Sequence, residues 1–450
     1  MSELKREKLT VTQEKAVLVG VILPGSTADP RDPLGELGSL AKTAGAKVVA
    51  TVLQNRKRVD ASTYIGSGKV EEIAAVCQSE KANVVVFDND LSPAQIGAIE
   101  RIVNKALDMD FGEGVRILDR SELILDIFAT RAQTHEAKLQ VELAQLEYTY
   151  PRLTKMWNHL ERISGGGAGG GIGARGPGEM QLEVDRRLVR NRVADLKKDI
   201  AKIQERKTRE VAARNRQHYT VCIVGYTNAG KSTLFNTLTA AGTYADDRLF
   251  ATLDTKTRAW KLEKGITLML SDTVGFVRDL PHKLVASFRA TLEEAVHADL
   301  LLHVLDVGHP RAEQQYKSVH EVLEEIGADG KPEILLLNKI DTEDGARQFP
   351  VWRAVYPNAV GISAKTGQGI ANMHEAIHRY VRGQQVEVEL EVNSNEGKLV
   401  SFLEAQCRID DRQYEDDKLR LKAIIGRGFL KDLQNNERIA ILSVKDAVDD

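Results

Sequence analysis

The sequence "VCIVGYTNAGKSTLFN" at residues 221–236 decides the fold of the central part of the chain. An apolar run ends at Gly225, and the spacing Gly-x-x-x-x-Gly-Lys-Ser then leads into a helical pattern. This spacing lets successive backbone N–H groups surround a phosphate at the N-terminus of a helix. It predicts a strand, a phosphate-binding loop and a helix, in which Lys231 bridges the β- and γ-phosphates of a nucleotide and the Ser232 hydroxyl holds Mg²⁺.

Three further motifs follow this loop in the order typical of a guanine-nucleotide domain. Asp272 ends an apolar strand, where it can hold Mg²⁺ through water, and Gly275 leaves its N–H free for the γ-phosphate. The sequence NKID (338–341) follows a second buried strand, and Asp341 can accept hydrogen bonds from the N1–H and 2-amino groups of guanine. Adenine offers neither donor there, so this carboxylate favours GTP over ATP. The sequence SAK (363–365) follows a third strand and would close over the guanine.

A threonine between the phosphate loop and Asp272 should contact both Mg²⁺ and the γ-phosphate. The stretch "FATLDTKTR" (250–258) offers Thr252 as our first choice and Thr255 as the alternative, although each threonine also fits an ordinary loop hydroxyl. The predicted Mg²⁺ ligands are therefore Ser232, Thr252 and Asp272. The predicted nucleotide-binding residues are Gly225, Tyr226, Thr227, Asn228, Ala229, Gly230, Lys231, Ser232, Thr233, Phe250, Ala251, Thr252, Asp272, Thr273, Val274, Gly275, Asn338, Lys339, Asp341, Ser363, Ala364 and Lys365.

The composition is typical of a soluble multidomain protein. The chain has 450 residues, of which 42% are hydrophobic and 28% charged, with a formal net charge of −3. This charge excludes a uniformly basic nucleic-acid binder but not a local basic patch. The cysteines Cys77, Cys222 and Cys407 lie far apart and predict neither a disulfide framework nor a metal-ligand spacing. No apolar run approaches the roughly 18 residues of a membrane span, and no signal-peptide pattern is visible, so we expect a cytoplasmic protein.

A helical hairpin is predicted between the two ends of the chain. Apolar residues from about 130 to 160 and from 189 to 203 recur at alternating spacings of four and three, which is typical of two helices packed along a seam. The stretch "SGGGAGGGIGARGPGE" (164–179) is too rich in glycine to form a helix or a core. The second arm, residues 183–216, has twelve Lys or Arg against six Asp or Glu. Either a solvated helix face or contact with RNA phosphates explains this excess.

The remaining segments complete a multidomain α/β fold. Residues 17–125 alternate β-branched runs with helical patterns, which predicts a small domain with a parallel sheet. In the same region "YIGSGK" (64–69) is too short for a phosphate loop, and we interpret it as a turn before a helix. The predicted domains are a small N-terminal α/β domain (1–128), an antiparallel helical hairpin (129–217) with its glycine-rich tip loop (164–179), a P-loop GTPase domain with a mainly parallel sheet (218–383) and a small α+β C-terminal domain (384–450).

Several long motifs, in this order, resemble the HflX family of ribosome-associated GTPases. They are "YIGSGK", "LDRSELILDIFATRAQTHEAKLQVELAQLEY", "GARGPGEMQLEVDRRLV", "FATLD" and "DTVGFVRDLP". The resemblance covers residues from about 20 to 382. It implies a GTP hydrolase that binds GTP and GDP, contacts the large ribosomal subunit and its rRNA, and reaches toward the peptidyl-transferase region with the hairpin loop. The loop here is longer than is usual in that family. The implied ribosome-contacting residues are Gly165, Gly170, Arg175, Arg186, Arg187 and Arg190.

The residue after Gly275 is Phe276, at the place where many GTPases keep the glutamine that orients the attacking water. An apolar side chain cannot orient water, so we assign no catalytic residue and expect slow intrinsic hydrolysis. Either the ribosome completes the site, or K⁺ supplies charge where an arginine finger otherwise would. Asn228 stands at the position that related GTPases use for K⁺, although it also fits a structural role.

The resemblance implies that the GTP-bound form dissociates stalled or idle ribosomes under stress, with hydrolysis for release. We expect a monomer that is partly ribosome-associated. The alternative is a GTP-dependent regulatory factor that binds ribosomes to inhibit translation or assembly without splitting them. Both functions need the same pocket and the same basic helix, so the sequence does not separate them.

Overall fold

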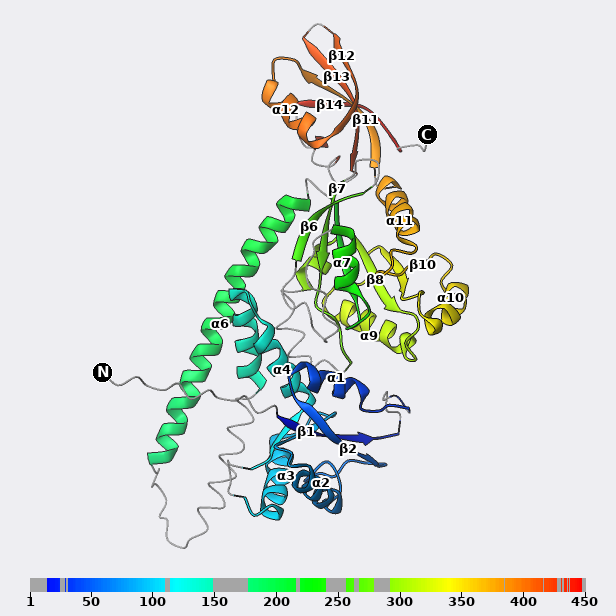
Figure 1. Cartoon of the computed structure of the whole chain (residues 1–450). Helices are drawn as coiled ribbons and strands as arrows, with labels where there is room; N and C mark the ends of the chain where they lie inside the picture. The colour runs from blue at the N-terminus through cyan, green and yellow to red at the C-terminus, as the bar shows by residue number, and fades with distance from the viewer. Residues whose placement is uncertain are drawn as a thin grey trace, which may run out of the picture. The chain divides into compact units, whose positions relative to one another are not determined.

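The computed structural model describes most of the chain in two compact units (Figure 1). One unit comprises Met1–Ile203, Asp246–Asp254 and Val274–Thr291, and the other comprises Gln204–Ala245, Thr255–Thr273 and Leu292–Asp450. The described residues are 14–24, 29, 31–109, 114–148, 177–215, 219–239, 256–262, 267–278, 292–383, 385–415, 417–426, 430, 433–434, 436 and 438–446.

The first unit contains a four-stranded parallel sheet in the order β2-β1-β3-β4. Its strands are β1 (Lys15–Ile22), β2 (Lys47–Asn55), β3 (Val84–Phe87) and β4 (Arg116–Asp119). Its helices are α1 (Gly35–Thr43), α2 (Ser67–Glu80), α3 (Pro93–Ala106) and α4 (Arg120–Arg131).

Alternating residues of β1 feed two separate cores, because successive strand side chains point to opposite faces. Ala16 and Leu18 pack with α1 and α4, while Val17 and Val19 pack with α2 and α3. Helices therefore cover both faces of the sheet (Figure 1), which confirms the predicted small α/β domain. Gly66 precedes α2 in extended backbone, so residues 64–66 are the predicted turn and residues 67–69 begin the helix.

Two helical segments of this unit pack along a common seam. Residues 135–148 are helical, and Leu139 and Leu143 form a cluster with Leu196 and Ile200 of α6 (Pro177–Asn215). Helix α6 begins at Pro177, so the last three residues of the predicted tip loop 164–179 are helical. Proline fits the first turn of a helix because the N–H that it lacks would have no partner within the helix. The rest of that loop lies outside the described residues.

The second unit contains a six-stranded sheet in the order β10-β9-β8-β5-β7-β6, parallel except for β6. Its strands are β5 (Tyr219–Gly225), β6 (Lys256–Lys261), β7 (Thr267–Asp272), β8 (Leu300–Asp306), β9 (Glu333–Asn338) and β10 (Val360–Gly361). Its helices are α7 (Lys231–Thr239), α9 (Ala312–Glu325), α10 (Glu343–Val355) and α11 (Ile370–Gly383). Helices α7 and α11 contribute to the core on one face of the sheet, and α9 and α10 contribute to the core on the other. The predicted P-loop fold is confirmed.

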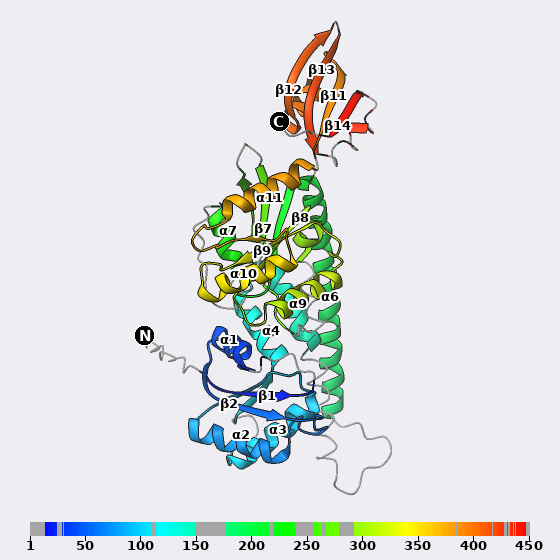
Figure 2. The ribbon, with the colours of Figure 1, turned by 90° about the vertical axis from the view of Figure 1, so that its right-hand side faces the viewer.

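The C-terminal part of the second unit is an antiparallel sheet in the order β12-β13-β11-β14 (Figure 2), with one helix against it (Figure 1). Its elements are β11 (Gln385–Asn393), α12 (Gly397–Gln406), β12 (Arg408–Glu415), β13 (Lys418–Gly426) and β14 (Ile439–Asp446). Val386, Val388 and Leu390 are buried in one core with Leu403 of α12, while Glu387 between them is exposed. The strict alternation of "VEVELEV" therefore produces the predicted strand with one buried face. None of the helices in the described part of the chain is both long and apolar enough to cross a membrane.

Candidate nucleotide-binding site

The loop between β5 and α7 has the backbone geometry that its glycines predict. Gly225 has a φ of 149°, and a Cβ there would lie 2.3 Å from the carbonyl oxygen of Val304. Gly230 has a φ of 102°, and a Cβ there would lie 2.2 Å from the side-chain nitrogen of Asn338. A side chain at either position would collide with a neighbouring strand end and strain the backbone. Asn228 also lies in the left-handed region, with a φ of 59°.

The side chains that should meet the phosphates and Mg²⁺ stand at the start of α7. Lys231 is buried, and its Nζ donates a hydrogen bond to the carbonyl of Tyr226 at 2.6 Å. Burial lowers the pKa of Lys231 to about 8. The Ser232 hydroxyl donates to a carboxylate oxygen of Asp272 at 2.9 Å. Two oxygen ligands suited to Mg²⁺ therefore come together from the phosphate loop and the end of β7.

Asn338 holds the phosphate loop and the SAK loop together. Its side-chain nitrogen donates to the carbonyl of Ala229 at 2.7 Å, and its side-chain oxygen accepts from the Ala364 N–H at 2.9 Å. Asn338 and Ala364 are both buried. The sequence motif alone did not predict that this asparagine bridges two loops.

The residues predicted to surround the base follow the ends of β9 and β10. Lys339 has a φ of 64°, and its Nζ pairs with Asp306 at 2.6 Å. Ser363 is fully buried, whereas Asp341 and Lys365 are exposed. Asp341 lies three residues beyond the end of β9, and its exposed carboxylate is available to a ligand. Asp306, at the end of β8, is a residue that the sequence analysis missed, although its place after a buried apolar run gave the signal.

Both candidates for the Mg²⁺-capping threonine, Thr252 and Thr255, lie outside the described residues, as do Phe250 and Ala251. Among the implied ribosome-contacting residues, Gly165, Gly170 and Arg175 also lie outside them. Arg186 belongs to α6.

The segment that follows β7 belongs to the first compact unit. Val274 and Val277 pack into the core formed by β1, α1 and α4, and Phe276 is 2% exposed. The side chain at the position of the water-orienting glutamine is therefore buried in protein. The phenyl ring can neither donate a hydrogen bond to a nucleophilic water nor accept one from it.

A buried charge network holds the same segment. Arg278 donates to Asp88 at 2.6 Å, and Arg120 donates to the other oxygen of Asp88 at 2.7 Å. Arg120 also donates to Glu36 at 2.6 Å and to the Arg278 carbonyl at 3.2 Å. Asp88 and Arg120 follow β3 and β4, at the carboxyl edge of the parallel sheet where ligands of such folds usually bind. The protein's own chain occupies part of this edge, a feature that the sequence analysis did not find.

Three family models match successive parts of the chain. They are described as GTP-binding GTPase N-terminal (residues 31–129), GTP-binding GTPase Middle Region (131–215) and 50S ribosome-binding GTPase (220–339). The chain is 40% identical over 431 residues to a GTPase HflX of Lacrimispora saccharolytica, covering 95% of this chain and 97% of that protein. It is 42% identical over 412 residues to a GTPase HflX of Escherichia coli, covering 91% and 93%. The chain belongs to the HflX family of GTPases.

Membership in the HflX family makes the protein a GTP hydrolase with a P-loop GTPase domain. Among solved structures, a GTP-binding protein from Sulfolobus solfataricus in complex with GDP aligns with a TM-score of 0.43 and 25% identity. That alignment covers 82% of this chain and 98% of the archaeal one. The motifs quoted from the sequence had indicated the same family.

Proposed function

We propose that this HflX-family protein binds the large ribosomal subunit and that its GTP-bound form dissociates stalled or idle ribosomes under stress. The observation that carries the proposal is the match of residues 220–339 to the model described as a 50S ribosome-binding GTPase, in a chain whose α6 is rich in basic residues. Arg187 and Arg190 on this helix are exposed, so they are available to rRNA phosphates. The protein acts as a cytoplasmic, partly ribosome-associated monomer.

The nucleotide site supports this role through GTP and Mg²⁺. The phosphate loop offers backbone N–H groups at the N-terminus of α7, and Lys231 supplies a positive charge there. Ser232 and Asp272 would hold Mg²⁺, with Thr252 as the third candidate. The bound ion would neutralise charge on the phosphate oxygens. Lys339 and Ser363 order the loops beside the base, and Asp341 reads the guanine.

Turnover in this site is slow until a partner completes it. Phe276 is buried, and its apolar side chain cannot position water by hydrogen bonding. The large subunit is the proposed activator. A contribution of K⁺ through Asn228 is the alternative, since this residue is exposed in the loop.

Steady-state GTP turnover separates these two possibilities. It should be measured with the protein alone, with small subunits and with large subunits, each in potassium and in sodium buffer. Stimulation by large subunits supports the proposal. Fast turnover without ribosomes that depends only on potassium would contradict it. A subunit-separation assay with a non-hydrolysable GTP analogue then distinguishes ribosome splitting from inhibition by binding alone.

Charge reversal on α6 is expected to weaken ribosome binding. The double variant Arg187→Glu, Arg190→Glu should bind large subunits more weakly. The slope of the logarithm of the binding constant against the logarithm of the salt concentration should become shallower by about one for each lost phosphate contact. Both side chains are exposed, so the fold should tolerate the changes. Arg347→Glu, at an exposed position on α10, is the matched control. Unchanged affinity of the double variant would leave this helix face as an ordinary solvated surface.

Asp341→Asn is expected to change the base preference. An amide in place of the carboxylate cannot accept both guanine donors, so GTP affinity should fall roughly 10- to 100-fold while xanthosine triphosphate gains. Competition between the two nucleotides for a fluorescent guanine nucleotide measures the change. Asp344→Asn, also exposed and three residues away, should keep the preference for GTP. If the Asp341 variant also keeps it, Asp341 does not read the base.

A further inference from the structure

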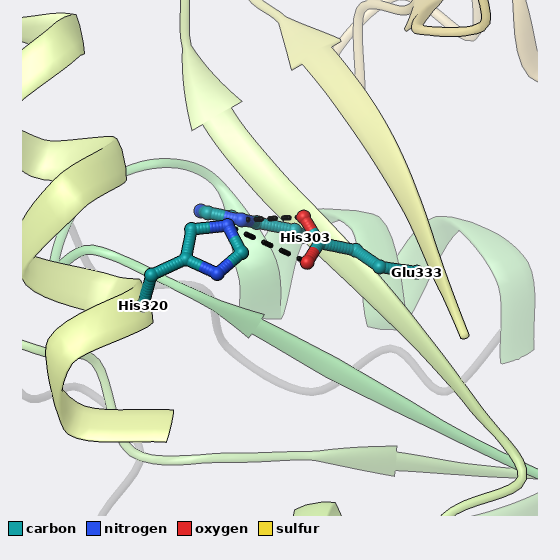
Figure 3. A group of neighbouring side chains, drawn as sticks. All are labelled: His303, His320 and Glu333. Atoms are coloured by element: carbon teal, nitrogen blue, oxygen red, sulfur yellow. Dashed lines mark hydrogen bonds and ion pairs between the residues drawn. The ribbon is translucent and has the colours of Figure 1, made fainter. Parts of the chain in front are cut away.

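Two histidines and a glutamate lie close together on the face of the GTPase sheet that α9 covers (Figure 3). His303 lies in β8, His320 in α9 and Glu333 at the start of β9, and Figure 3 shows the three side chains pointing toward one another. Neighbouring Leu302 and Val304 face the core under α7 and α11, so alternation directs His303 to the side that α9 covers. These residues are far apart in the sequence, and no motif predicted their contact.

The distances within this group fit a shared metal ion. His303 Nδ1 lies 2.9 Å from one carboxylate oxygen of Glu333, and His320 Nε2 lies 3.5 Å from the other. One ligand atom from each side chain lies within 4.8 Å of the other two. Ligand atoms on one tetrahedral zinc ion are about 3.3 Å apart, given Zn–N and Zn–O bonds of about 2.0 Å. Small side-chain adjustments would bring all three atoms onto one ion.

The three side chains offer the kinds of ligand atom that zinc binds, two imidazole nitrogens and one carboxylate oxygen. The 3.5 Å separation of His320 from the carboxylate is at the outer limit of a hydrogen bond, and an ion between them would contact both atoms closely.

The surroundings close one side of the group and leave another open. Tyr316 stacks on His303 with a centroid distance of 5.1 Å and lies 4.5 Å from the ring of His320. His303 is fully buried, whereas the side chain of His320 is 40% exposed. The Nε2 atom of His320 is buried although the rest of its side chain reaches solvent, so a metal ion would enter through a movement of the His320 side chain.

We propose that His303, His320 and Glu333 form a binding site for one divalent transition-metal ion of the zinc type. The ion links β8, α9 and β9 and stabilises this face of the GTPase domain. Two imidazoles and one carboxylate favour zinc and its neighbours over magnesium or calcium, which prefer oxygen ligands. The site shares no residue with the proposed Mg²⁺ ligands, so its test is independent of the proposed function.

Cobalt(II) titration of the full chain, first freed of transition metals, tests the site directly. Saturating GDP and Mg²⁺ should be present throughout so that the nucleotide-site ligands are occupied. We expect a visible d–d absorption band of bound cobalt that saturates at one equivalent and disappears when Zn²⁺ is added. We also expect Zn²⁺ to raise the unfolding temperature. Burial raises the pKa of the Cys77 and Cys407 thiols to about 11, so these thiols compete poorly for the ion.

Two variants decide whether the band belongs to this group. His320→Ala and Glu333→Gln should each weaken metal binding at least about tenfold, the lower end of what perturbing a metal site usually costs. His135→Ala removes an exposed histidine elsewhere and should change nothing. Retained GDP binding shows that the variants are folded. The proposal is overturned if the unaltered chain gives no stoichiometric band, or if His320→Ala binds cobalt as tightly as the unaltered chain does. If the two variants lose stability but bind metal as the unaltered chain does, the three side chains form only a hydrogen-bonded cluster, and the proposal is likewise overturned.

Discussion

Lys231→Ala is expected to reduce GTP and GDP affinity on the order of 100-fold or more. Lys231 is buried at the start of α7, where its positive charge would meet the phosphates of the nucleotide. Its Nζ already donates to the carbonyl of Tyr226, which fixes the ammonium above the loop before any ligand arrives. Alanine removes a charge-assisted hydrogen bond to phosphate in a water-poor site, where such bonds are strongest.

Fluorescent nucleotide binding measures this loss, and Lys317→Ala provides the control. Lys317 is an exposed lysine of α9, paired with Glu313 on the surface at 2.7 Å, so its removal should leave affinity unchanged. Thermal unfolding without nucleotide checks that the Lys231 variant keeps its fold. Loss of a buried cation should not destabilise it, because burial already disfavours the charged form and lowers the pKa of Lys231. Tight GTP binding by a folded Lys231→Ala variant would place the phosphates elsewhere.

The sequence predicted those parts of the fold that depend on local patterns. The phosphate loop was visible because Gly225 and Gly230 must adopt positive φ angles at a fixed spacing. The parallel sheets were visible because buried strands are short apolar runs between helical patterns. The strand Val386–Val392 was visible because its alternation has a period of two. Each of these signals is contained in a short window of the chain.

The features that the sequence did not predict depend on contacts between distant segments. Asp88 and Arg278 are separated by 190 residues, yet they form a buried ion pair. His303 and Glu333 meet because β8 and β9 pair in parallel, which a lone histidine in an apolar strand does not indicate. Helix α6 begins within the predicted loop because Pro177, Gly178 and Glu179 fit a first helical turn as well as a loop. Local composition cannot choose between a loop and a helical turn for these three residues.

Asp88→Ala is expected to lower the free energy of unfolding of the first unit by about 3–5 kcal/mol, the usual cost of removing one partner from a buried ion pair. The change leaves the guanidinium groups of Arg120 and Arg278 without their shared carboxylate, and both side chains are buried. Glu36 still pairs with Arg120, whereas the Arg278 guanidinium loses the carboxylate oxygen that it contacts at 2.6 Å, so we expect the larger shift at the Arg278 side chain. Chemical denaturation followed by circular dichroism measures the loss. Glu71→Ala, an exposed position on α2, is the control and should change stability by less than about 0.5 kcal/mol.

Hydrogen exchange at residues 274–278 tests where the destabilisation acts. If Asp88 holds this segment through Arg278, the amides of the segment should lose protection in Asp88→Ala, while those of β1 keep more of theirs. Arg278→Ala should expose the same amides with a smaller loss of stability, because Arg120 remains paired with Asp88. The two substitutions should therefore not be additive in the double variant. Additive effects, or unchanged exchange in the segment, would mean that Val274 and Val277 hold it through apolar packing alone. Non-additive effects would mean that the ion pair between Asp88 and Arg278, at the carboxyl edge of the N-terminal sheet, holds the residues on either side of Phe276 in place.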